Sequence, residues 1–154
     1  LSVLASEVPM LVDTAKLSTL LGISRTTLLA YLEYLDEAKL IRRLYSDDLS
    51  VKKMQKPDKI LMDNCNLLKV LALKEPNIGT LRETFFCNQL GYQHQVEYSK
   101  QGDFLIDHQI TFEIGGQAKE GKQVAAIENA YIVADDIEYS YGNKLPIWLF
   151  GLLY

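Results

Sequence analysis

The stretch DTAKLSTLLGISRTTLLAYLEYLDEAK, residues 13–39, decides the fold of the first part of this chain. Leucines recur at helical spacing in its first half, and Gly22 follows where that helix must end. Ser24 can cap a second helix that reaches about residue 39, with leucines at i, i+4 and i+7. Two helices joined at a glycine predict a helix-turn-helix.

A hairpin completes this pattern. Residues 40–45 alternate sufficiently for a strand, the next three residues supply turn chemistry, and residues 59–62 are typical of a returning strand. We therefore expect a winged helix-turn-helix over residues 12–62. Residues 1–11 are expected to be the end of a preceding helix or a linker.

The remainder, residues 63–154, predicts a small α/β module. The pattern indicates helices, then three strands, then a helical crossing segment and a last strand. The expected helices span residues 66–73 and 81–90, the strands 95–98, 103–106, 110–114 and 131–134, and the crossing segment 119–126. The chain as a whole is expected to be α+β.

Charge is distributed unevenly along the chain. Residues 12–62 hold nine Lys/Arg against seven Asp/Glu, whereas residues 63–154 hold seven against twelve. A polyanion should therefore meet the first part, because phosphate binding depends on local positive charge. The 48% of hydrophobic residues indicates a globular chain and excludes a disordered or fibrous one.

Several classes of protein do not fit the sequence. The two cysteines lie far apart without the paired spacing of a zinc site, which favours a reduced, cytoplasmic compartment. The longest apolar stretch is too short to span a membrane, and no leader opens the chain. No GxxxxGK[ST] phosphate loop is present, so no ATP chemistry is expected in this piece. Because it begins at Leu1 in a helix-like segment, we expect a piece of a longer protein.

The winged helix offers candidate nucleic-acid contacts in two places. A recognition helix presents donors from its N-terminal turns, and a basic wing can follow a phosphate backbone. Against this, Glu33, Asp36 and Glu37 make the later turns of the helix acidic. Contact with DNA and a purely protein-facing or structural winged helix therefore both stay open. The candidate residues are Arg25, Thr26, Thr27, Arg42, Arg43, Lys52 and Lys53.

Three carboxylates of the second part lie in the order that a metal-dependent nuclease requires. Glu83 is on the first helix of that order, Asp103 opens a strand, and Glu113 ends the next strand. Carboxylates that converge at strand ends hold Mg²⁺, and a nearby lysine assists the attacking water. The order resembles the PD-(D/E)XK, or restriction-endonuclease-like, superfamily.

A closer resemblance rests on three motifs that follow the winged helix: GTLRETFF at residues 79–86, GDFLI at 102–106 and TFEI at 111–114. Together they resemble the uncharacterised C-terminal region that follows an AAA-type P-loop ATPase domain in many prokaryotic ATP-binding proteins. The resemblance covers nearly the whole chain. It implies that ATP and Mg²⁺ bind in an upstream ATPase domain, which would also be a partner of this region.

One position departs from that family. Its strand motif is generally Glu-x-Lys, but here Gly115 stands where the lysine would be, and Lys119 lies six residues after Glu113. The sequence therefore predicts a degenerate site and a non-catalytic regulatory or nucleic-acid-contacting region that needs no cofactor of its own. The alternatives are an active Mg²⁺-dependent nuclease, with Glu83, Asp103 and Glu113 as metal ligands and Lys119 swung in, and a protein-interaction module without DNA binding.

Overall fold

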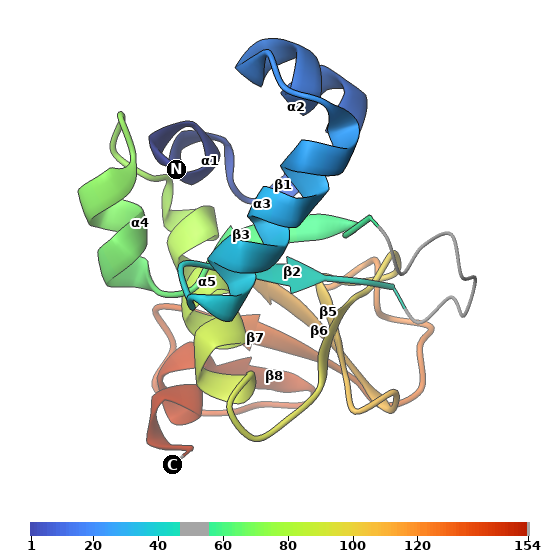
Figure 1. Cartoon of the computed structure of the whole chain (residues 1–154). Coiled ribbons are helices and arrows are strands. Elements are labelled where there is room, and N and C mark those ends of the chain that lie inside the picture. The colour runs from blue at the N-terminus through green and yellow to red at the C-terminus, as the bar shows by residue number, and fades with distance from the viewer. Residues whose placement is uncertain (47–55, 154) are drawn as a thin grey trace. The chain divides into compact units, whose positions relative to one another are not determined.

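The computed structural model describes residues 1–46 and 56–153, and the chain divides into two compact units, Leu1–Pro76 and Asn77–Tyr154. Figure 1 labels the elements of both. The helix expected at residues 66–73 is α4 (Cys65–Leu71), which packs against α1 (Ser2–Glu7) within the first unit, although the sequence had assigned it to the second part. Among the residues described, no helix has the length and apolar character needed to cross a bilayer.

Local capping defines the two helices of the helix-turn-helix. The α2 helix (Thr14–Leu21) begins where the Asp13 carboxylate accepts hydrogen bonds from two backbone N–H groups, and it ends at Gly22, which has φ +65°. The α3 helix (Arg25–Glu37) begins at Ser24, whose hydroxyl accepts from the N–H of Thr27. Side-chain caps and a left-handed glycine are the expected ends of helices, so the predicted helix-turn-helix is confirmed.

The sheet of the first unit has three strands. The hairpin strands β2 (Ile41–Leu44) and β3 (Lys59–Met62) pair antiparallel, as predicted, and β1 (Met10–Leu11) adds to the other side of β3. Every residue of β3 is buried, because this central strand lies between two partners and under the helices. The short strand β1 falls in a segment that the sequence left as a helix end or linker.

The second unit contains a mixed five-stranded sheet in the order β4-β5-β6-β7-β8. Its first three strands are antiparallel, and β6, β7 and β8 run parallel. The first four match predicted strands, whereas β8 was not predicted. The strands are β4 (Val96–Tyr98), β5 (Phe104–Ile106), β6 (Ile110–Gly115), β7 (Ala130–Ala134) and β8 (Lys144–Pro146).

An aromatic cluster attaches helix α5 (Ile78–Leu90) to one face of this sheet. Phe86 of α5 lies with its ring centroid 5.4 Å from that of Phe104, 5.1 Å from that of Phe112 and 4.8 Å from that of Phe150. Phe150 belongs to the short 3-10 helix η1 (Ile147–Leu152). Aromatic rings at these separations contribute stability beyond the area that they bury. The core of the unit therefore lies between α5, η1 and the sheet.

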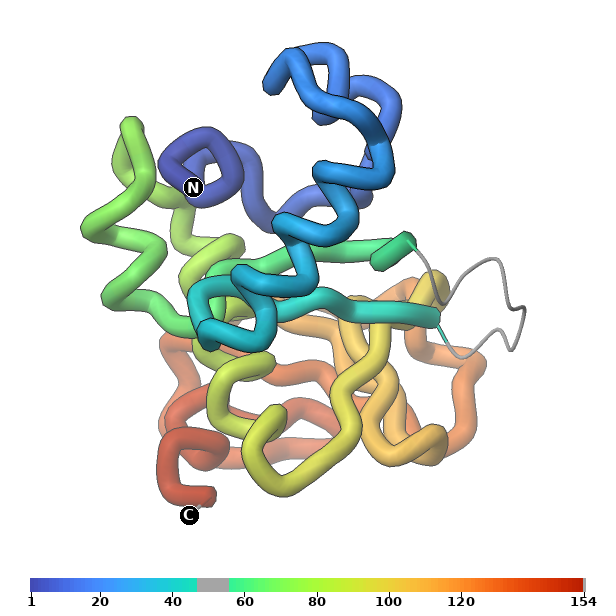
Figure 2. Tube along the Cα trace, in the orientation of Figure 1, coloured from blue at the N-terminus to red at the C-terminus, as the bar shows by residue number. Residues whose placement is uncertain are grey.

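The connection from β6 to β7 contains no helix, so the predicted helical crossing segment at residues 119–126 is wrong. Figure 2 shows this part of the chain as an irregular loop in orange. Val124 is buried and packs with Ala130 and Ile132 of β7. Because Ile132 pairs with Glu113, and side chains alternate along a strand, this loop covers the face of the sheet opposite α5. Val124 therefore packs against the face of the sheet that a crossover helix usually covers between two parallel strands.

Gly22 gives a direct test of the helix-turn-helix. Its φ of +65° suits glycine, and an added Cβ would meet no atom within 4 Å, so the cost of a substitution is backbone strain rather than collision. We expect Gly22→Val to lower the free energy of unfolding by more than about 1 kcal/mol in urea titrations. Gly22→Asn is the matched control, because asparagine tolerates this conformation. Equal stability of the valine variant and the parent would contradict the assigned turn.

Candidate functional site

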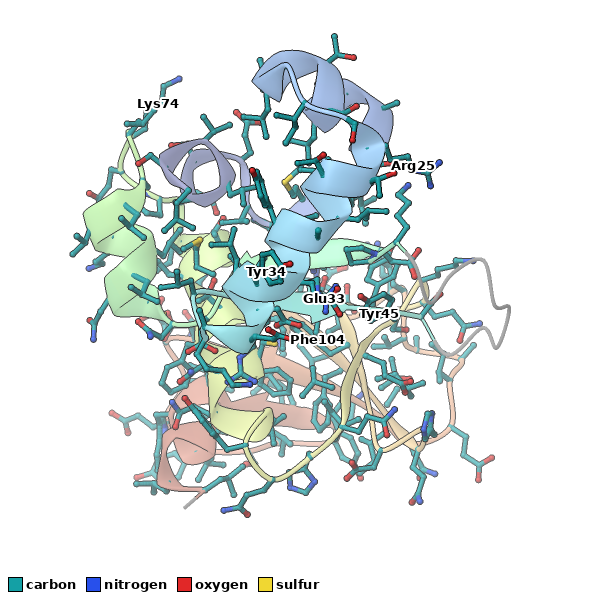
Figure 3. All side chains as sticks on the ribbon, in the orientation of Figure 1. Arg25, Glu33, Tyr34, Tyr45, Lys74 and Phe104 are labelled. Atoms are coloured by element: carbon teal, nitrogen blue, oxygen red, sulfur yellow. The ribbon has the colours of Figure 1, made fainter. Side chains whose placement is uncertain are left out.

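The N-terminal turn of α3 presents part of the predicted DNA-reading set. Arg25 and Thr26 are exposed, and Figure 3 labels Arg25 at this end of the helix. Thr27 is different, because its hydroxyl lies 2.8 Å from that of Ser24 in the cap and is therefore committed to the helix end. Two of the three predicted side chains are thus available to a ligand.

The later turns of α3 are acidic on their outward face. Glu33 and Glu37 lie one helical turn apart, are both exposed, and point away from the buried Leu28 and Leu32. Tyr34 beside them is 62% exposed (Figure 3). The exposed carboxylates of Glu33 and Glu37 repel phosphate from the later turns of α3.

The two arginines of β2 are engaged within the unit. The Nε of Arg42 lies 2.9 Å from Oδ1 of Asp63, and both side chains are largely buried. The Nε of Arg43 lies 3.0 Å from Oδ2 of Asp36 on α3. These pairs attach β2 to its neighbours. Either arginine would have to leave its ion pair to bind phosphate, which disfavours the prediction that both contact nucleic acid. Lys52 and Lys53, the other predicted wing contacts, lie outside the described residues.

An apolar groove adjoins α3. It has a volume of about 300 Å³ and is lined by residues of α1, the end of α2 and α3. Its α3 wall includes Leu28, Tyr31 and Leu35, and Tyr31 is 53% exposed. Hydrophobic side chains in the groove and on its rim remain in contact with water, which is unfavourable unless another apolar surface covers them.

In the second unit, two of the three predicted carboxylates are neighbours. The register of β5 and β6 pairs Phe104 with Phe112, and Asp103 and Glu113 are the next residues of the chain beside that pair. The backbone N–H of Asp103 donates to the carbonyl of Phe112, and Oδ2 of Asp103 accepts from the N–H of Ile114 at 2.7 Å. Phe112 packs against Phe86 of α5, and side chains alternate along a strand, so Glu113 lies on the face away from α5, while the Asp103 carboxylate reaches the β6 backbone at Ile114.

Lys119 joins this pair. Its Nζ lies 2.9 Å from Oε1 of Glu113, whose side chain is 2% exposed, whereas that of Lys119 is 37% exposed. The other oxygen of Glu113 is buried and has no hydrogen-bond partner among the described residues. Both residues line an open pocket of about 300 Å³ whose remaining wall is the loop of residues 118–123.

Glu83 does not complete a metal-ligand set. Within residues 1–46 and 56–153 there is no group of three or more His, Cys, Asp or Glu side chains that could hold a metal ion. Glu83 belongs to α5, which covers the other face of the sheet. The predicted three-carboxylate arrangement is therefore reduced to Asp103 and Glu113.

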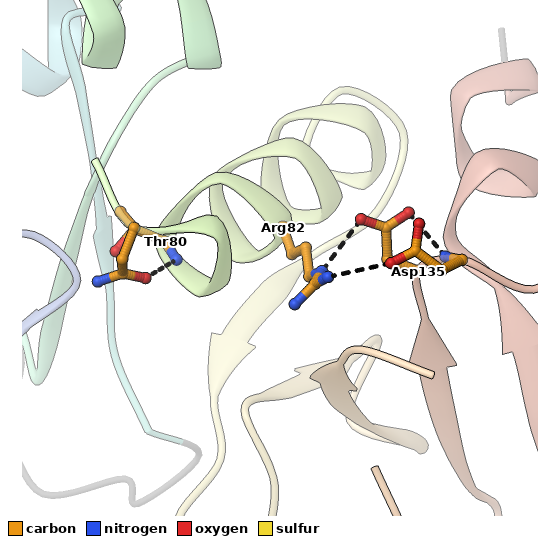
Figure 4. Close-up of polar contacts among 5 residues, drawn as sticks. Thr80, Arg82 and Asp135 are labelled. Atoms are coloured by element: carbon orange, nitrogen blue, oxygen red, sulfur yellow. Dashed lines mark hydrogen bonds and ion pairs between the residues drawn. The ribbon is translucent and has the colours of Figure 1, made fainter. Parts of the chain in front are cut away.

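Arg82 lies near this site but is not among the residues that the sequence predicts for it. Its guanidinium lies 3.1 Å from Asp135 and 3.8 Å from Asp136, just after β7, and connects α5 to the end of that strand (Figure 4). The same guanidinium lies over Gly116, where an added Cβ would be 3.3 Å from its Nη1. The adjacent aspartates at the end of a strand were the available signal.

Other titratable groups have structural explanations. The pKa of Asp107 lies below its usual value because its side chain hydrogen-bonds to His94 and accepts from the N–H of Gln95. Burial raises the pKa of the Cys65 thiol. Neither observation points to further chemistry.

Comparison with known families and proteins bears on the first unit. Residues 11–45 match the family described as elongation factor SelB, winged helix. The match covers less than a quarter of the chain, and it agrees with the order of α2, α3 and β2. No curated protein matches the chain, and neither does any solved structure. The first unit therefore contains a winged helix, and a winged helix serves contact with nucleic acid or with protein.

Proposed function

We propose that this chain is a non-catalytic regulatory region of a larger AAA-type ATP-binding protein, and that its winged helix binds protein rather than DNA. The observation that carries the choice of ligand is the acidic outward face of α3, with Glu33 and Glu37 exposed. The ATPase part of the proposal rests on the sequence resemblance alone.

Electrostatics favours a basic protein surface as the partner. DNA binding depends on several lysines and arginines that displace counterions, but Arg42 and Arg43 already neutralise Asp63 and Asp36. Bringing phosphates up to the later turns of α3 would also bring them near the exposed carboxylates of Glu33 and Glu37. Lysines and arginines of a protein partner would instead be attracted to the same face.

The composition of the surface supports the same choice. Tyr31 and Tyr34 are exposed on α3, and tyrosine is enriched at protein interfaces. The apolar groove lies on the other side of α3 from Glu33 and Glu37, and it gives the partner's hydrophobic side chains a place to be buried. We infer a partner segment that carries both basic and apolar side chains, and the upstream ATPase domain is the first place to look for it.

The choice between protein and DNA can be tested by fluorescence anisotropy with a labelled duplex at several salt concentrations. We expect the parent chain to show no salt-dependent binding. Glu33→Lys combined with Glu37→Lys should create such binding, because the change adds four units of positive charge to the outward face of α3. The matched control reverses the charge of the exposed Glu7 and Glu75 in the same unit, and it should bind less.

Tight binding by the parent, with an affinity that falls steeply as salt rises, would contradict the protein-facing proposal and favour the DNA-contacting one. The proposal also predicts that the isolated upstream ATPase domain binds this chain, and calorimetry would measure that affinity. The proposal predicts that Glu33→Lys with Glu37→Lys weakens that binding by at least about tenfold, which corresponds to about 1.4 kcal/mol.

A second candidate function is metal-dependent phosphodiester cleavage, and the ion pair of Lys119 with Glu113 favours it. Asp103 and Glu113 supply the oxygen ligands that Mg²⁺ prefers, and two carboxylates with water suffice for this ion. A bound Mg²⁺ would lower the pKa of its water and neutralise charge on the phosphate. In this candidate Asp103 and Glu113 hold the ion, while Lys119 holds the Glu113 carboxylate in place and faces the pocket.

The two candidates differ in a cleavage assay with Mg²⁺ or Mn²⁺ on single- and double-stranded DNA. We expect no cleavage, because Glu113 is buried beneath the loop and Glu83 adds no third ligand. The assay must detect slow turnover, since loss of one stabilising group typically costs about 10²–10³-fold in rate. Cleavage that disappears in both Glu113→Ala and Asp103→Ala would reverse the order of the two candidates.

A further inference from the structure

The sequence places glycine where a Glu-x-Lys strand would carry its lysine, yet the structure has an ammonium beside the glutamate. Residues i and i+2 of a strand point to the same face, so a lysine at position 115 would extend alongside Glu113. Lys119 reaches Glu113 from a different part of the chain, with 2.9 Å between Nζ and Oε1.

The space that a side chain at position 115 would occupy is filled by Lys119. A Cβ built on Gly115 would lie 2.7 Å from Cγ, 2.8 Å from Cβ and 2.9 Å from Cδ of Lys119. Cβ atoms do not approach other carbons so closely in stable proteins. The aliphatic part of Lys119 therefore lies across Gly115, and it can do so only because residue 115 has no side chain.

A tight turn returns the chain to this position. The N–H of Lys119 donates to the carbonyl of Gly116 at 3.0 Å, which closes the turn of residues 116–119. The buried ammonium of Lys144 donates to the carbonyl of Gln117 at 3.0 Å. With Arg82 over Gly116, the turn is held from both sides, so Lys119 is fixed in place by contacts outside the ion pair.

We propose that Gly115 and Lys119 are an exchanged pair: Lys119 takes the place of the strand lysine, and Gly115 makes the room for it. The lysine beside Glu113 is then relocated rather than lost, and Lys119 is the positioning residue for Glu113 in the open pocket that both residues line. A role of Lys119 in cleavage rests on the second candidate function, whereas the exchange of positions between Gly115 and Lys119 does not.

The exchange can be tested by moving the lysine back. The full chain is compared as the parent, as Lys119→Met, as Gly115→Ala and as Gly115→Lys with Lys119→Ala. Lys122→Ala is the matched control from the same loop, since Lys122 pairs with the exposed Glu120. Thermal unfolding is followed for all five, and cleavage of DNA with Mn²⁺ is measured in parallel.

We expect Lys119→Met to lower the melting temperature by several degrees, because it keeps the aliphatic chain but leaves a buried carboxylate without its cation. Gly115→Ala should also lower it, although Gly→Ala in a strand is ordinarily stabilising. The variant with Gly115→Lys and Lys119→Ala should recover most of the lost melting temperature. The Lys122→Ala control should melt within about 1 °C of the parent.

A double variant no more stable than Lys119→Met, or a Gly115→Ala variant more stable than the parent, would overturn the exchange. Recovery of stability without cleavage in any variant would support the exchange and refute the second candidate function. Cleavage that is lost in Lys119→Met and returns in the double variant would support both the exchange and the second candidate function. A lysine that only stabilises the fold would not restore cleavage when it is moved to position 115.

Discussion

A carboxylate buried inside a β-sheet requires a cation beside it, and the second unit is arranged around this requirement at Glu113. This residue is 1% exposed on the central strand β6. An ionised carboxylate that is removed from water without a partner is strongly destabilising. Lys119 supplies the charge, and the turn that brings it, the glycine at position 115 and the loop over the sheet all follow from that need.

The same loop explains why the unit needs no crossover helix. A parallel pair of strands is usually connected through a helix that covers one face of the sheet. Here α5 covers one face through Phe86, and the β6–β7 loop covers the other through Val124. Gly121 allows that loop to lie close to the sheet, since a Cβ there would meet Ile132. The loop therefore serves the core and the acidic pair together.

The winged helix was predictable because its signals are local. The side chain of Asp13 caps α2 and that of Ser24 caps α3, within three residues of the groups they bind, and Gly22 ends a helix through its own backbone. Such contacts can be inferred from a short window of sequence. The strands β2 and β3 were recognised for a similar reason, since their alternation and turn residues are adjacent in the chain.

The parts that could not be predicted depend on partners distant in sequence. Arg42 looked like a phosphate contact, but it pairs with Asp63 after a separation of 21 residues. The crossing segment has polar residues that suit a helix, yet its conformation depends on Lys144 and Ile132, which belong to other strands. A strand as short as β8 has too few residues to show alternation, and it exists because β7 pairs with it.

The surroundings of Glu113 show that distance along the sequence and distance in space can differ. Counting along the chain treats Gly115 as a lysine that has been lost, since Lys119 is six residues from Glu113. In space the glycine is what allows Lys119 to lie along the strand. The sequence does contain a signal of this, because two glycines after Glu-Ile permit an immediate reversal, and a lysine three residues after Gly116 stands where a tight turn returns to the strand. A glycine in place of a charged motif residue is therefore compatible with the same charge at the same point in space, supplied from a few residues later by a tight turn.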